Sequence, residues 1–223
     1  MKTLKYLIVA SVAVFAMASS AFAQVDGSAH DLTTGGGASD ITGDVDGQFC
    51  VFCHTPHSEG TLTPLWNRGA PAGPFTMYTS ATIAGTQQAS PVGVSAACLS
   101  CHDGVVSLDT MYNAPTTVSG TYNNTATPTD KITTWTTGDG LINSAVDVGT
   151  DLSNDHPISL TYGADSAMEP IGNFPANGLP LYGAGSDQVE CGTCHNPHDI
   201  SNVPFLRIDN TNSALCTTCH SDK

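Results

Sequence analysis

Four copies of one five-residue pattern, Cys-x-x-Cys-His, contain every cysteine of this 223-residue chain. Two thiols three positions apart can each add to one of the two vinyl groups at a porphyrin edge, and the following histidine is then placed under the iron. The pattern therefore predicts covalent attachment of four haems of the c type. The predicted attachment residues are Cys50, Cys53, Cys98, Cys101, Cys191, Cys194, Cys216 and Cys219, and the predicted proximal iron ligands are His54, His102, His195 and His220.

Disulfides, zinc and a redox-active dithiol are the competing interpretations of these cysteines. A disulfide framework suits an exported protein, but it does not require a histidine after every second cysteine. Paired C-x-x-C zinc sites do not carry that histidine either. A thioredoxin-like dithiol occurs once, on a βαβ background. Haem attachment is the interpretation that accounts for all four copies.

Four further histidines, His30, His57, His156 and His198, equal the four irons in number. We predict them to be the distal ligands, so that every iron is held by two histidines. For each of them alone, an ordinary surface or turn histidine is the alternative. The even balance between irons and histidines favours ligation.

His57 and His198 each follow a proximal histidine by three residues, in Cys-His-Thr-Pro-His and Cys-His-Asn-Pro-His. A side chain so close in sequence does not readily pass around the porphyrin to the opposite face of the same iron. We therefore predict that both ligate a neighbouring haem. The intervening proline fixes φ and stiffens the turn that presents the second histidine.

Carboxylates and thioethers near these ligands have less specific interpretations. Asp31 and Asp155 are candidates to orient His30 and His156 through the other ring nitrogen, and a solvated turn carboxylate is the alternative. Methionine is the other possible sixth ligand. The methionines of the mature chain, which we expect to fill gaps in a loose core, are Met77, Met111 and Met168.

The pattern of motifs repeats once along the chain. Residues 24–103 and 151–223 each hold one spare histidine, one Cys-x-x-Cys-His-x-Pro-His and one plain Cys-x-x-Cys-His. Between them, residues 104–150 form an insertion rich in Thr, Gly and Asn, which is either irregular or contains a small hairpin around Met111 and Ile132. The predicted fold is mostly coil with short helices and a few short strands, wrapped around a chain of four haems.

Residues 1–23 have the features of a secretory signal peptide. Lys2 and Lys5 precede an apolar stretch, and Ala21-Phe22-Ala23 forms a small-x-small cleavage site. No later segment is apolar enough to cross a bilayer. We therefore expect residues 24–223 to be one exported tetrahaem domain, located outside the cell or at its surface, with the periplasm as the alternative.

The charge balance excludes one class of partner. Six Lys and Arg residues stand against 20 Asp and Glu residues, for a formal charge of −14, and two of the lysines lie in the predicted leader. Nucleic-acid binding requires clustered basic residues, so a DNA or RNA partner is not expected. The acidity suits solubility outside the cell, and a basic redox partner is the alternative reading.

The doubled Cys-x-x-Cys-His-x-Pro-His arrangement, the N-terminal Ala-His-Asp-Leu and the internal Asn-Asp-His-Pro-Ile-Ser resemble one family. It is the family of doubled CxxCH multihaem cytochromes, and specifically the OmcE-like tetrahaem extracellular cytochrome nanowires of metal-reducing bacteria. The resemblance covers essentially the whole mature chain. It implies end-to-end polymerisation of the chain with itself and an axial histidine donated across the interface, for which His30 is the best match.

The expected function is electron transfer without catalysis. Irons held by two histidines have no open position for a substrate, and histidine ligation favours lower potentials than methionine does. The partners would then be redox donors and acceptors, or external electron acceptors. A soluble periplasmic shuttle is the second hypothesis. A multihaem enzyme is the third, and it requires a haem with an open position.

Overall fold

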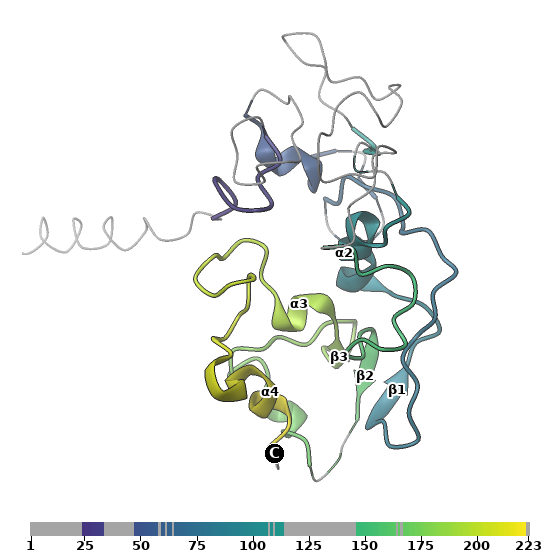
Figure 1. Cartoon of the computed structure of the whole chain (residues 1–223), viewed down its shortest axis with the longest axis vertical. Helices are drawn as coiled ribbons and strands as arrows, with labels where there is room; N and C mark the ends of the chain where they lie inside the picture. The colour runs from purple at the N-terminus through teal and green to yellow at the C-terminus, as the bar shows by residue number, and fades with distance from the viewer. Residues whose placement is uncertain are drawn as a thin grey trace, which may run out of the picture.

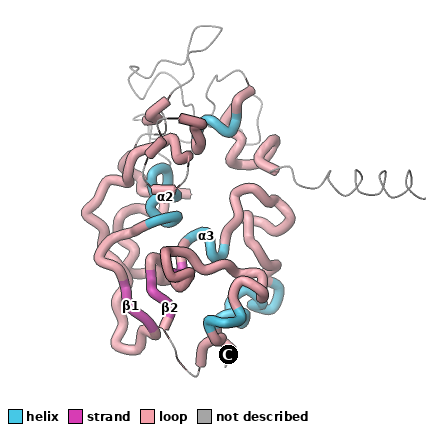
Figure 2. The backbone as a smooth tube through the Cα atoms, turned by 180° about the vertical axis from the view of Figure 1, so that it is seen from behind, coloured by secondary structure: helices cyan, strands magenta, loops and turns pink. Residues whose placement is uncertain are grey.

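The computed structural model describes residues 24–33, 47–57, 59–60, 62–63, 65–106, 108, 110–113, 146–163, 165 and 167–221. The predicted leader and the greater part of the insertion, including Ile132, lie outside these residues. Loops and turns make up most of the described chain, with a few short helices and one small sheet (Figure 2). The predicted fold class is therefore confirmed.

The helical segments are short, and each haem-attachment motif lies on or beside one of them. The largest among the described residues is the ten-residue α2. The segments that carry the motifs are the 3-10 helix η2 (Phe49–Phe52), α2 (Gly93–His102), α3 (Cys191–Cys194) and α4 (Ala214–Cys219). Two further 3-10 turns are η4 (Ile171–Asn173) and η5 (Thr211–Ser213). Short helical segments thus present the motifs.

Helix α2 ends where its sequence stops favouring a helix. Asp103 is the C-cap, and its Oδ1 accepts the backbone N–H groups of Val105 at 2.9 Å and Val106 at 2.8 Å. Gly104 follows with φ of 65°, a left-handed conformation that glycine adopts without steric cost. The chain therefore turns sharply just after His102.

One antiparallel sheet of three strands, in the order β1-β2-β3, joins the two halves of the chain. The strands are β1 (Gly85–Gln87), β2 (Leu160–Tyr162) and β3 (Gln188–Val189). Gly85 pairs with Tyr162, and a Cβ at Gly85 would collide with the carbonyl oxygen of Thr161. The close approach of β1 to β2 therefore requires glycine at this position.

The described apolar core includes two small clusters, besides buried leucines such as Leu99 and Leu152. The cluster on the sheet contains Leu160, Tyr162, Leu181 and Val189, with Ile83, Met168 and Phe174 packed against it. The second cluster pairs Phe52 with Met111, beside Leu32 and Val51. Met111 and Met168 thus act as packing residues, as predicted. Met111 is not in a strand, and the rest of the predicted hairpin lies outside the described residues.

The loops that follow the first and third motifs are built with the same hydrogen bonds. In both, the residue after the motif histidine donates its N–H to a residue of positive φ, and a later N–H returns to the second motif cysteine. The bonds are Thr55 to Leu65 and Asn67 to Cys53 in one loop, and Asn196 to Phe205 and Arg207 to Cys194 in the other. The local sequence likeness of these segments thus corresponds to a likeness of structure.

The haem-attachment helices lie in sequence order along the molecule. In Figure 1, α2, α3 and α4 follow one another down the long axis, while the sheet flanks them on one side. No helix in the described part of the chain is long and apolar enough to span a membrane.

Candidate haem-attachment sites

Within each motif, a helical turn places both cysteines on the same side. Residues three apart on a helix are neighbours on its surface. The histidine is then fixed by the backbone. In the second motif, His102 is the last residue of α2, and in the other three motifs the histidine N–H donates to the carbonyl of the first motif cysteine. These bonds are His54 to Cys50 at 2.8 Å, His195 to Cys191 at 3.0 Å and His220 to Cys216 at 2.9 Å.

All eight cysteines lie among the described residues, and none forms a disulfide. Burial raises the pKa of the Cys53 thiol to about 12 and that of Cys219 to about 11. Thiolates, rather than thiols, are the nucleophilic form of cysteine. Burial therefore favours the protonated form of these two thiols.

Six of the eight histidines meet as three pairs of imidazole rings. Each pair joins one motif histidine to one histidine outside the motifs. The pairs are His30 and His102 with ring centroids 6.2 Å apart, His54 and His198 at 6.0 Å, and His156 and His220 at 6.4 Å. Among the described residues, no group of three or more His, Cys, Asp or Glu side chains is placed to hold a metal ion.

The separation within these pairs fits one iron between two imidazoles. Metal–imidazole nitrogen bonds are about 2 Å long, so two rings on opposite sides of one metal have centroids about 6 Å apart. Interplanar angles of 81° and 77° place two pairs with their rings nearly perpendicular, and 23° places the His54–His198 pair nearly parallel. The residues present therefore fit haem with two axial histidines.

Hydrogen bonds also place three of the imidazoles in the tautomer that binds iron. In each, Nδ1 lies within hydrogen-bond distance of a backbone carbonyl, which can only accept. Nδ1 therefore carries the proton, and Nε2 keeps a free lone pair. The bonds run from His102 to Val146 at 2.8 Å, from His156 to Pro157 at 3.0 Å and from His195 to Pro204 at 2.9 Å.

Burial favours the neutral, ligating form of several of these rings. It lowers the pKa of His30 to about 4 and also lowers the pKa of His54 and of His156. His30 is stacked on the ring of Phe205, with centroids 4.5 Å apart and an interplanar angle of 21°. Its Nδ1 is buried without a hydrogen-bond partner. Phe205 thus orients His30 by packing, a role that no sequence motif indicated.

The carboxylates predicted to orient His30 and His156 do not contact their rings. Asp31 is buried, and its carboxylate accepts hydrogen bonds from the N–H of Gly27 at 2.9 Å and from the N–H and hydroxyl of Thr33 at 3.1 and 2.6 Å. Asp31 therefore stabilises the turn that carries His30. Asp155 is exposed, and the Nδ1 of His156 bonds to a carbonyl instead. Asp155 therefore fits the alternative of a solvated turn carboxylate, and Asp31 is a turn carboxylate that is buried.

His57 and His195 are both exposed, and no other ring in the described residues lies against either of them. His30 was predicted to serve a neighbouring molecule, but the structure places it against His102 of its own chain. Donation of His30 to a neighbouring molecule, which the sequence resemblance implies, stays a prediction. The expectation that a histidine three residues after a motif serves another haem fits His198, whose ring faces His54.

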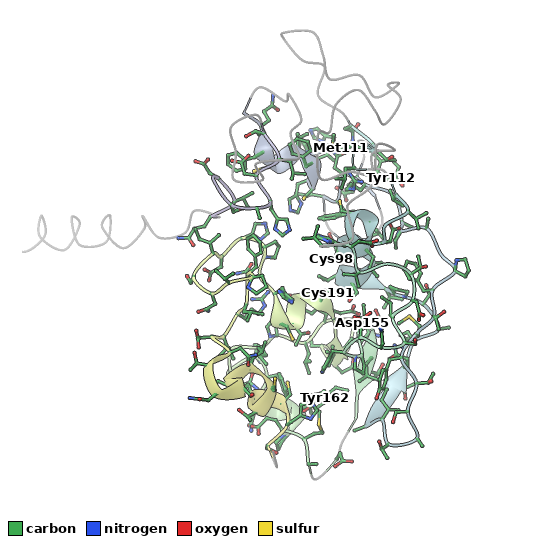
Figure 3. The ribbon with its side chains drawn as sticks, viewed as in Figure 1. Cys98, Met111, Tyr112, Asp155, Tyr162 and Cys191 are labelled. Carbon is green, nitrogen blue, oxygen red and sulfur yellow. The ribbon has the colours of Figure 1, made fainter. Side chains whose placement is uncertain are left out.

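Consecutive motifs are neighbours in space through their cysteines. The Cys53 thiol has its pKa raised by burial and by nearby Cys101, which joins the first motif to the second. A hydrogen bond to Cys191 raises the pKa of Cys98, which joins the second to the third, and Figure 3 shows these two side chains between α2 and α3. Cys219, whose pKa is raised by burial and by Cys194, joins the third to the fourth.

Residues 184–223 match a family described as the doubled CXXCH motif. The match includes the third and fourth motifs, and it supports a multihaem c-type cytochrome with covalently bound haem c. Multihaem cytochromes of this kind are typically electron carriers. No curated protein matches the chain.

Two arginines, one in the loop after the first motif and one in the loop after the third, donate hydrogen bonds to backbone carbonyls of the motifs. Arg68 is fully buried, and its guanidinium donates to the carbonyl of Ser100, inside the second motif, at 3.3 and 3.1 Å. Arg207 donates to the carbonyl of Gly192, inside the third motif, at 2.6 Å. The repeated arginine was visible in the sequence, but its target was not, because it depends on the tertiary fold.

Proposed function

We propose that this chain is a secreted tetrahaem c-type cytochrome whose irons are each held by two histidines and which carries electrons. The observation that carries the proposal is the set of three imidazole pairs with centroids 6.0 to 6.4 Å apart. Each pair combines a histidine of a Cys-x-x-Cys-His motif with one outside the motifs. That separation matches two ligands on opposite sides of one metal.

Haem iron supplies a reversible one-electron change of oxidation state. The protein supplies the rest: cysteine pairs anchor the group, and paired histidines occupy both axial positions. With both positions filled, a small substrate has no site on the metal. The paired histidines therefore support electron transfer over catalysis, so we propose that the protein is not an enzyme.

The fourth site combines Cys191, Cys194 and His195 with His57. His198, which follows the third motif, faces the histidine of the first motif. If the first and third motifs exchange ligands in both directions, His57, which follows the first motif, is the distal ligand of the haem at the third motif. His57 then comes from the same chain in a discrete particle, or from a second copy in a polymer.

The arrangement of motifs supports a linear path for electrons. Cysteines of consecutive motifs lie close enough to shift each other's pKa. The motif helices follow one another down the long axis of the molecule (Figure 1). The first and last motifs are therefore the natural points of entry and exit. Together with the sequence resemblance, this favours end-to-end assembly into an extracellular conducting filament that passes electrons to external acceptors. A soluble periplasmic shuttle is the alternative.

Haem content and carbon monoxide binding test the central proposal. We expect the pyridine haemochrome assay and the intact mass to give four haems per chain, and the native ferrous protein to show no carbon monoxide spectrum. A stoichiometric spectral shift in the native state would instead support the enzyme. Electron microscopy of the extracellular fraction, compared with the periplasmic fraction, separates filaments from discrete particles.

Dilution tests the origin of the fourth distal ligand. If His57 serves its own chain, monomers isolated by gel filtration keep four low-spin irons. If it is donated between copies, each monomer has one iron short of a ligand, and that iron binds carbon monoxide. His57→Ala should produce the same spectrum in either case.

A further inference from the structure

A buried carboxylate lies where the second and third haem-attachment helices meet. Glu190 directly precedes Cys191 and is only 1% exposed. Its Oε2 accepts a hydrogen bond from the N–H of Ser95 at 3.3 Å and from the hydroxyl of Ser159 at 3.0 Å. Its Oε1 is buried with no hydrogen-bond partner.

This carboxylate fastens the N-terminal ends of two helices. It is the N-cap of α3, where its own N–H donates to the hydroxyl of Thr193 at 3.0 Å. It also accepts from the first turn of α2 through Ser95, whose hydroxyl in turn accepts the N–H of Cys191 at 2.9 Å. Ser159 completes the junction by accepting the N–H of Val92, the N-cap of α2, at 3.0 Å.

The junction brings attachment points of two different haems together. Cys98 of α2 and Cys191 of α3 lie close enough for each to shift the pKa of the other, and Figure 3 shows Cys191 just below Cys98. The two helices are closely packed, since a Cβ on Gly192 would lie 2.9 Å from a methyl carbon of Val94. A small change in the junction would therefore change the separation of the two sulfur atoms.

Keeping a carboxylate here is costly for stability. Burial raises the pKa of Glu190 against the opposing effect of its hydrogen bonds from Ser95 and Ser159. Burying a carboxylate with an unsatisfied oxygen is unfavourable, and an apolar side chain of similar size would avoid that cost. The arrangement is better explained by the geometry that the directional hydrogen bonds impose on the two helices.

We propose that Glu190 is a positioning residue that sets the separation of the second and third haems, and with it the coupling between them. This inference rests on the proposed function, because it requires haem at both motifs. Glu190 acts through Ser95 and Ser159 on the two helix ends. Electron passage between the first and second halves of the chain then depends on a residue that contacts neither iron.

Circular dichroism of the haem Soret band tests the proposal, because two close haems give a bisignate couplet whose size depends on their separation and angle. We expect Glu190→Ala to lose the part of the couplet that these two haems contribute, so that the wild-type minus variant spectrum is itself bisignate. Glu190→Gln should keep the couplet, since its amide oxygen accepts the same two hydrogen bonds. Leu179→Ala, a buried residue outside both helices, serves as the control for lost stability.

The outcomes separate this inference from the proposed function. A wild-type haem count other than four contradicts the proposed function. With four haems, an unchanged couplet in Glu190→Ala, or an equal loss in Glu190→Gln, overturns the positioning role. If Glu190→Ala does not accumulate, Ser159→Ala removes one of the two bonds to Oε2 and should lose part of the couplet, and an unchanged couplet there also overturns it.

Discussion

The proposed ligation of each iron by two histidines is tested at single residues, and His198 offers the clearest case. Its ring lies 6.0 Å from that of His54, although the two residues belong to different halves of the sequence. We expect His198→Ala to leave one iron of four with a single protein ligand. The measurement is a carbon monoxide titration of the reduced variant, which should show one binding equivalent where the wild type shows none.

A neighbouring substitution provides the control for this prediction. Asp199→Asn keeps the side-chain oxygen that accepts the N–H of Ser201 at 2.9 Å, so the loop should stay in place. Its spectrum should match the wild type. If His198→Ala also remains fully low-spin, His198 is not an axial ligand and the pair in the structure has another role.

At this scale the sequence predicted which residues hold haem but not how they combine. Cysteines and proximal histidines are visible because their chemistry needs a fixed spacing within five residues. The distal histidines were predicted because four histidines outside the motifs equal the four expected irons in number. Their partners depend on tertiary packing, so the pairing of His30 with His102 was not predicted from the sequence. The support of His30 by Phe205 is a packing contact without a sequence pattern.

At the scale of the elements, Tyr162 in β2 gives the clearest prediction of how stability depends on pH. The Tyr162 hydroxyl donates to the carbonyl of Glu169 at 2.8 Å, and burial raises the pKa of Tyr162 to about 12. Folding therefore favours the neutral phenol. Its contribution to stability is complete below the usual tyrosine pKa of about 10 and is lost as the pH rises through about 12.

Tyr162→Phe tests this contribution while keeping the ring packed on Phe174, whose centroid is 5.3 Å away. We expect the variant to be less stable by about 1 kcal/mol at neutral pH, the usual worth of one hydrogen bond. The difference should shrink above pH 10. Guanidinium unfolding of both proteins across this range measures it, and a constant difference would contradict the assigned titration.

The sheet itself was harder to predict than the helical turns. The motifs dictate helical turns, because one turn aligns both cysteines. The strands have three residues or fewer, which is too short for an alternating pattern to stand out. Their pairing depends instead on a backbone approach at Gly85 that is apparent only in the folded chain.

The whole molecule has little apolar core of its own in the described residues. The clusters centred on Leu160 and on Phe52 hold few buried side chains, and the large buried apolar side chains outside them are Leu99, Leu108, Leu152 and Leu179. Such clusters offset little of the conformational entropy lost on folding. We therefore expect the chain produced without haem attachment to lack a cooperative thermal transition and near-ultraviolet circular dichroism. The haem-loaded protein is the control, and a cooperative transition in the haem-free chain would show that the polypeptide suffices.

The pairing of His198 with His54 has a consequence for the order in which the protein is made. Chains are synthesised from the N-terminus, so Cys50 and Cys53 are the first motif cysteines to be made. With the proposed ligands, the second site has both of its histidines early, because His30 precedes His102. The first site would gain its second histidine only with His198, near the end of the chain. A chain truncated before His198 would then lack one ligand at its first motif.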